Sequence, residues 1–231
     1  MSQYLPTAAR LGGAALLLSG LSGVAVAQNQ VYDPLPPPGS AYVRFVNAAD
    51  AAITVKPDFV GVQQLGTAAA QRVSAFMPIE KVAGRELSLD VQAGSRSVKA
   101  SLKAAAGSYV TVLIESDPAK GLVVVPVVDN TEFNQSRARL SFYNATSCVA
   151  ASLTIDPDGP VVFPDVAAGT AKARSVNPVT AKIHAACDGK PVPSIALEGM
   201  EAGAMYSVWL MGAGVSPQSF LTRDATAKYK P

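Results

Sequence analysis

Apolar and polar residues alternate with a period of two along most of this chain. At 41–48, for example, Val43 and Phe45 alternate with Tyr42 and Arg44. This spacing is typical of a β-strand that turns one face to a core and the other to solvent. Comparable short runs, separated by Asp, Gly and Pro, lie at 53–56, 72–77, 86–91, 97–102, 109–115, 122–128, 152–155, 171–176, 181–186, 193–197, 206–211 and 218–223. The pattern therefore predicts an all-β protein.

The strand pattern repeats along the chain, which indicates an internal duplication. At a constant offset of 97 residues, Val43 matches Leu140, Phe45 matches Phe142, Asn47 matches Asn144, Ala48 matches Ala145, Tyr109 matches Tyr206 and Leu113 matches Leu210. Many short strands in each repeat of about 90 residues are typical of an antiparallel sandwich. We therefore predict two tandem homologous antiparallel β-sandwich domains at 41–128 and 138–224, with a linker at 129–137 and a C-terminal tail at 225–231. One continuous barrel is the alternative, but two similar repeats favour two cores.

The first 27 residues have the features of a cleaved signal peptide. Arg10 is their only charge, 11–24 is an apolar run, and small residues at 25–27 suit a signal peptidase. The apolar run is interrupted by Gly and Ser and is shorter than the roughly 18 residues that a membrane-spanning helix needs. The lead-in at 28–40 is rich in proline, which favours an extended backbone. We expect an exported protein without a membrane anchor.

The charge of the chain does not point to a polyanion or a nucleic acid as a partner. There are 19 Lys and Arg against 17 Asp and Glu, so any attraction to a polyanion must come from a local patch. No stripe of basic residues with interleaved aromatic residues is present, and nucleic-acid binding is therefore not expected.

The two cysteines, Cys148 and Cys187, lie 39 residues apart in the second repeat. In an oxidising compartment such a pair favours a disulfide. Free thiols and a thiol with a chemical role are the alternatives. Two separated cysteines with a single histidine make a poor ligand set for a metal, so no metal site is predicted.

The sequence offers few residues for catalysis. His184 is the only histidine, which leaves little choice of base for a Ser-His-Asp or Cys-His device. The serine-hydrolase motifs, including the Gly-Asp-Ser block of SGNH hydrolases, are absent. The run at 156–159 is too short for a calcium loop, and the glycines form no phosphate-binding loop. We predict no catalytic residue and no cofactor, although a pair of carboxylates from distant strands stays open.

Five residues are candidates for a binding face: Tyr42, Arg44, Arg139, Tyr143 and Trp209. All five lie out of phase with the apolar residues of their strands and are expected to face outward. Aromatic rings can stack on sugars, and Arg can bind the carboxylates of an acidic polymer. The same residues are also compatible with an ordinary exposed sheet face.

Motifs near the predicted mature N-terminus resemble the AlgF family. Val-Tyr-Asp-Pro at 31–34 leads through Pro-Gly-Ser at 38–40 into the strand Ala-Tyr-Val-Arg-Phe-Val-Asn-Ala at 41–48, and Ser-Val-Asn-Pro-Val at 175–179 is a second similar patch. These motifs belong to strands and turns, not to a catalytic set. The chain departs from the family pattern in its triple proline, its cysteine pair and the long loop at 57–70.

The resemblance implies a periplasmic accessory protein for O-acetylation of alginate or a similar exported polysaccharide. Its partners would be SGNH-type acetyltransferases and a membrane-bound acyl-transport protein, and an anionic polysaccharide is a further candidate partner. Two other functions stay open. One is an acetyltransferase with a Ser or Thr activated by His184 or by an acidic residue, and the other is a stand-alone carbohydrate-binding or adhesion module.

Overall fold

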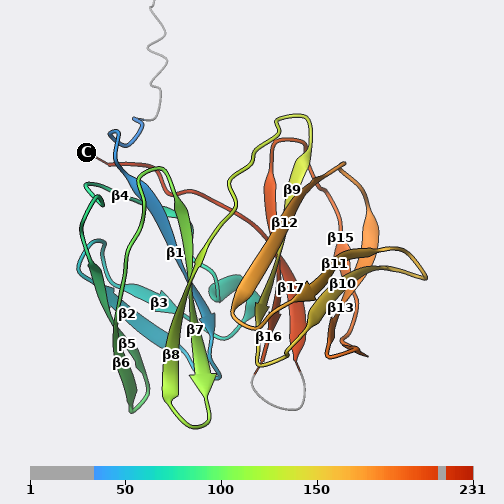
Figure 1. Cartoon of the computed structure of the whole chain (residues 1–231), viewed down its shortest axis with the longest axis horizontal. Helices are drawn as coiled ribbons and strands as arrows, with labels where there is room; N and C mark the ends of the chain where they lie inside the picture. The colour runs from blue at the N-terminus through green and yellow to red at the C-terminus, as the bar shows by residue number, and fades with distance from the viewer. Residues whose placement is uncertain (1–33, 213–216, 231) are drawn as a thin grey trace, which may run out of the picture. The chain divides into compact units, whose positions relative to one another are not determined.

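The computed structural model describes residues 34–212 and 217–230, and within them the secondary structure is almost entirely β (Figure 1). The predicted signal peptide at 1–27 lies outside these residues. The strands are β1 (Ala41–Ala48), β2 (Ile53–Pro57), β3 (Gln63–Leu65), β4 (Met77–Ile79), β5 (Leu87–Ala93), β6 (Arg96–Leu102), β7 (Tyr109–Asp117), β8 (Gly121–Val128), β9 (Ala138–Ala145), β10 (Ala151–Asp156), β11 (Val161–Val166), β12 (Thr170–Val176), β13 (Ala181–Cys187), β14 (Lys190–Pro191), β15 (Ile195–Leu197), β16 (Met205–Met211) and β17 (Gln218–Arg223). One 3-10 helix covers Ala69–Gln71, and no helix among the described residues is long and apolar enough to cross a membrane.

Two pairs of sheets repeat the same strand order. The first half contains sheets with the orders β4-β1-β7-β8 and β3-β2-β5-β6. The second half contains β12-β9-β16-β17 and β11-β10-β13-β14, with β15 also paired to β13. Each strand of the first half thus has a counterpart of similar position in the second, as the sequence repeat suggested. The prediction of an all-β sandwich fold is confirmed.

Each half buries its own apolar cluster between its two sheets. In the first half, Val43 and Phe45 of β1 belong to the same cluster as Leu87 and Leu89 of β5. The second half has the same plan, in which Phe142 of β9 belongs to a separate cluster. The removal of apolar surface from water is the main favourable term in folding. The two sheets of each half therefore pack with the apolar faces of their strands against each other. The described residues of both halves nevertheless belong to one compact unit.

The prediction that all strands run antiparallel is wrong at two places. β1 pairs with β7 in parallel, with Tyr42 opposite Tyr109, and β9 pairs with β16 in parallel. Parallel neighbours need a long crossover connection. Here the chain between β1 and β7 passes through the second sheet before it returns. Alternation of apolar residues is the same in both directions, so it could not reveal this.

Three short strands were missed and one was misplaced. β3 is polar, β14 has two residues, and β11 contains Pro164 and Asp165, the latter with a positive φ of 50°. These features hide the strand pattern. The run predicted at 72–77 is a strand only from Met77, because Arg72 and Ser74 use their hydrogen-bonding groups at the edge of β1.

The two central sheets, β4-β1-β7-β8 and β12-β9-β16-β17, face each other through a third apolar cluster, which we call the inter-sheet cluster. Its buried members are Val46, Ala48, Leu113, Val127, Tyr143, Ala145, Trp209 and Met211. They point away from the two sandwich cores. All eight residues of β9 are consequently buried, since both faces of this strand are covered.

The burial of Glu115 beside the inter-sheet cluster is expected to make the stability of the protein depend on pH. It lies two residues after Leu113 on β7, opposite Ala48 of β1, and its Oε1 atom is buried without a hydrogen-bond partner among the described residues. Burial, followed by the nearby charge of Asp117, raises the pKa of Glu115 to about 7. The unfolded value is about 4.3, so between these values the native state keeps a proton that the unfolded state has lost.

This difference in proton binding is expected to make the protein less stable as the pH rises. Between pH 5 and pH 8 the free energy of unfolding should fall by about 2 kcal/mol, and Glu115→Gln should remove most of that fall. Urea titrations of both proteins at several pH values measure this effect. Identical pH profiles for wild type and variant would contradict it.

Candidate functional site

Arg44 is the centre of a buried polar network between the two central sheets. Its side chain leaves β1 on the face opposite Val43 and is only 1% exposed. The guanidinium donates from Nε to Thr111 Oγ1 at 2.8 Å and from Nη1 to Asp224 Oδ1 at 2.8 Å. Its Nη2 donates to Tyr143 OH at 2.8 Å and to Ser207 Oγ at 3.2 Å. One arginine of the first half thus binds three residues that belong to or follow strands of the second half.

Two aspartates complete the network, and each follows the last strand of its half. Asp129 comes directly after β8 and accepts hydrogen bonds from Thr111, at 2.7 Å, and from Tyr143. Asp224 comes directly after β17 and accepts a hydrogen bond from Ser207 at 2.8 Å, in addition to the one from Arg44. Every carboxylate oxygen of the pair therefore has a donor.

Burial and neighbouring charge act in opposite directions on these groups. Burial raises the pKa of Asp129 above its ordinary value, although Arg44 opposes this. Burial alone would lower the pKa of Arg44, but Tyr143 and the two aspartates outweigh it and raise that pKa. Burial also raises the pKa of Tyr143. The network therefore joins one guanidinium and two carboxylates through hydroxyl groups.

Aromatic rings surround the guanidinium of Arg44. Its Cζ atom lies 4.2 Å from the ring centroid of Phe76 and 4.8 Å from that of Trp209. Tyr143 stacks on Trp209 with centroids 4.2 Å apart, and Trp209 donates to Thr222 Oγ1 at 2.8 Å. Such cation–π contacts are strongest where water is excluded. The rings therefore hold Arg44 in one position.

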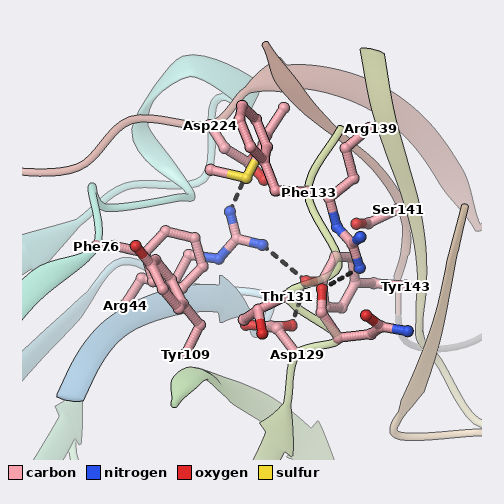
Figure 2. Close-up of a pocket in the computed structure, with 12 residues that line it drawn as sticks. Arg44, Phe76, Tyr109, Asp129, Thr131, Phe133, Arg139, Ser141, Tyr143 and Asp224 are labelled. Atoms are coloured by element: carbon pink, nitrogen blue, oxygen red, sulfur yellow. Dashed lines mark hydrogen bonds and ion pairs between the residues drawn. The ribbon is translucent and has the colours of Figure 1, made fainter. Parts of the chain in front are cut away.

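A cavity of about 280 Å³ opens beside this network. Figure 2 shows the side chains that converge on it, with Phe76 and Tyr109 on one side and Arg139 and Ser141 on the other. The lining residues are Arg44, Phe76, Tyr109, Asp129, Asn130, Thr131, Phe133, Arg139, Ser141, Tyr143, Met205 and Asp224. They come from both central sheets and from the segment between β8 and β9.

Arg139 fixes the segment that borders this cavity. Its Nη1 and Nη2 atoms donate to the backbone carbonyls of Glu132 and Asn130. Burial lowers the pKa of Arg139, and the acidic groups nearby oppose that shift. The guanidinium thus acts as a brace for the backbone at 130–132.

The C-terminal tail also crosses from the second half to the first (Figure 1). Phe76 N donates to Ala225 O at 2.8 Å, and Ala227 N donates to Phe76 O at 2.7 Å. Tyr229 OH donates to Glu80 Oε1 at 2.5 Å. These bonds hold the residues after Asp224 against the residues on either side of β4.

The expectation that the five candidate binding residues are exposed is wrong for four of them. Arg44, Arg139, Tyr143 and Trp209 are 1%, 5%, 2% and 0% exposed. They do lie on the strand face away from their own core, but the opposite sheet covers that face. Tyr42 is half-buried and stacks on Tyr109, with ring centroids 4.4 Å apart.

Three of these five residues line the cavity: Arg44, Arg139 and Tyr143. Trp209 packs behind Tyr143, and Tyr42 contacts the cavity only through Tyr109. Asp129 and Asp224 were not among the predicted site residues, because they were expected in a linker and at the end of a domain. The available signal was that each aspartate follows an equivalent strand at the end of its repeat.

The chain is similar to known proteins over most of its length. The family described as "Alginate O-acetyl transferase AlgF" matches residues 13–206. The chain belongs to the AlgF family. It is 26% identical over 201 residues to an alginate biosynthesis protein AlgF of Pseudomonas putida KT2440, a match that covers 87% of this chain and 86% of the relative. An AlgF of Pseudomonas fluorescens is 28% identical over 222 residues, which covers 93% of this chain and 94% of that protein.

The AlgF family description includes a transferase. His184 is the only histidine that could act as a base in such a reaction, so its contacts can be compared with those of a catalytic triad. His184 Nδ1 lies 2.5 Å from Asp156 Oδ1, and Ser194 Oγ donates to Asp156 Oδ2 at 2.6 Å. The carboxylate therefore lies between the hydroxyl and the imidazole. In a Ser-His-Asp device the imidazole lies in the middle and takes the serine proton, so the order here is different.

The cysteines of this AlgF chain form the predicted disulfide. Cys148 and Cys187 are bonded, with their Cα atoms 5.4 Å apart. The bond joins the segment before β10 to the end of β13. Cys148, Cys187 and Asp188 are close enough to suggest a metal site, but sulfur atoms that are bonded to each other are not available as thiolate ligands.

Proposed function

We propose that this AlgF-family chain is a non-catalytic, exported accessory protein of polysaccharide O-acetylation. It would act in the periplasm and hold SGNH-type acetyltransferases beside a membrane-bound acyl-transport protein. The family description and the names of both relatives support a link to alginate biosynthesis and O-acetylation. The bridging role, the partners and the compartment are the parts that we propose.

The arrangement around His184 is the observation that supports a non-catalytic role. The only imidazole of the chain is bonded to Asp156, and Ser194 bonds the other oxygen of the same carboxylate. A serine nucleophile needs a base within hydrogen-bond reach, and general base catalysis contributes typically 10²–10⁴-fold to a rate. An accessory protein has no such need and instead raises the effective concentration of one partner at another.

An acetyltransferase is the second candidate, because Ser194, Asp156 and His184 do lie together. The variant His184→Ala distinguishes the two functions. In a strain that lacks the chromosomal gene, we expect this variant to restore the O-acetyl content of the exported polymer to the wild-type level, as measured by proton NMR. Ser194→Ala should behave in the same way.

Protein levels, measured by immunoblot, are the control for this experiment. A loss of acetylation of 10²-fold or more with normal levels of the His184→Ala protein would support the enzyme and contradict the accessory role.

Bridging is tested directly with purified components. The immobilised mature chain should bind an SGNH-type acetyltransferase and the detergent-solubilised transport protein at the same time. If the two partners compete for one site, or if neither binds, the bridging role is contradicted.

A further inference from the structure

The cavity beside Arg44 differs from the exposed binding face that the sequence suggested. We propose that it receives one large apolar side chain, aromatic or long aliphatic, from a partner protein. The cavity would then be a docking point of the proposed accessory protein, so this inference rests on the proposed function. Three observations support it: the bonding of the charged groups, the nature of the free surface, and the size of the cavity.

The charged groups of the cavity are engaged with one another. A guanidinium has five N–H groups, and that of Arg44 donates four hydrogen bonds, so nearly all of its donors are in use. Each oxygen of Asp129 and Asp224 already accepts a bond. Both terminal nitrogens of Arg139 bind backbone carbonyls. The two arginines and two aspartates among the lining residues also balance in charge, so the cavity has no net attraction for an acidic sugar.

The remaining lining surface is mainly aromatic and aliphatic. Phe76, Tyr109, Phe133 and Met205 contribute it. Phe133 is 54% exposed although it is a large apolar side chain. It comes directly after the backbone at 130–132, to which Arg139 is bonded. An exposed aromatic side chain at the mouth of a concave apolar site is a common feature of a protein interface.

The size of the cavity suits one large side chain. Pockets for drug-sized molecules measure about 300–1,000 Å³, and this cavity of about 280 Å³ lies at the lower limit of that range. Pockets that receive one anchor residue are typical of the centres of protein interfaces. The cavity is also continuous with the inter-sheet cluster, because Tyr143 belongs to both. Its floor is therefore part of a packed cluster.

Amide NMR of the full mature chain tests the inference with side-chain mimics. The probes are N-acetyl-tryptophanamide and N-acetyl-leucinamide, with N-acetyl-alaninamide as the control for the backbone. We expect the tryptophan probe to bind with a Kd of about 0.1–1 mM, and the alanine probe to be at least tenfold weaker. The shifted signals should belong to Phe76, Tyr109 and Phe133.

Two variants and one matched control localise the binding. Phe133→Ala should weaken the tryptophan probe at least fivefold, and Ser141→Leu should block it by filling the cavity. Val161→Ala is the control, because Val161 is 52% exposed on β11, outside the cavity lining. If Ser141→Leu fails to fold, the exposed Phe133 still provides the test.

Trimannuronate serves as the competing probe. If it shifts the cavity signals with a lower Kd than the tryptophan probe, the cavity is a carbohydrate site and the inference is overturned. If no probe shifts these signals at about 10 mM, which is at least about tenfold above the expected Kd, the inference is overturned as well. Neither result affects the proposed function, which is judged by acetylation in cells. Conversely, probe binding by a chain that does not support acetylation would contradict the proposed function alone.

Discussion

Replacing Arg44 with alanine is expected to lower the free energy of unfolding by about 3–5 kcal/mol. The variant removes the cation but leaves the carboxylates of Asp129 and Asp224 in a site that excludes water. It also removes the hydrogen bonds that join β1 to Tyr143 and Ser207 of the facing sheet. Urea unfolding monitored by the fluorescence of Trp209, which lies 4.8 Å from the guanidinium, measures the loss.

Arg85→Ala is the matched control for this prediction. Arg85 faces Asp58 at 3.6 Å, and both side chains are substantially exposed, at 38% and 47%. Exposed ion pairs contribute little, so we expect a change of less than about 0.5 kcal/mol. If Arg44→Ala were no more destabilising than Arg85→Ala, the account of the buried network would be wrong.

Removing the disulfide is expected to have a similarly large effect. The double variant Cys148→Ala and Cys187→Ala frees a loop of 39 residues that contains most of the sheet around β13. In the chain-entropy model, closing a loop of this length stabilises the fold by about 4 kcal/mol. For a protein of this size, the loss corresponds to a decrease in Tm of about 10 °C. Scanning calorimetry of both proteins measures it.

A reductant separates the effect of the bond from that of the side chains. Dithiothreitol should lower the Tm of the wild type and leave that of the double variant unchanged. A wild-type Tm that is insensitive to the reductant, with the thiols shown to be free, would contradict the expected contribution.

The sequence predicted the fold class because each strand keeps one face in a core. The alternation of Val43 and Phe45 with Arg44 correctly assigned the core side of β1. It could not predict what covers the other side. Val46 on that other side of β1, and Trp209 on the side of β16 that faces away from its core, were the signs that a second sheet would cover these faces. For this reason the predicted binding face turned out to be an interface within the chain.

The candidate site could be predicted only in part. Arg44, Arg139 and Tyr143 were singled out as unusual on their strands, and all three line the cavity. Asp129 and Asp224 are polar residues at strand ends, where aspartate normally satisfies a turn. Their role depends on the packing of two distant sheets, which local patterns do not encode. The parallel pairing of β1 with β7 was hidden because the alternation of apolar residues is the same for both strand directions.

Deletion of the gene shows whether this chain takes part in polysaccharide O-acetylation. The O-acetyl content and the yield of the exported polysaccharide would be measured by proton NMR in the deletion strain and in the same strain carrying the wild-type gene. We predict that deletion removes the acetyl groups while polymer is still made, with the acetyltransferases present at normal levels. Unchanged acetylation in the deletion strain would contradict a role of this chain in polysaccharide O-acetylation.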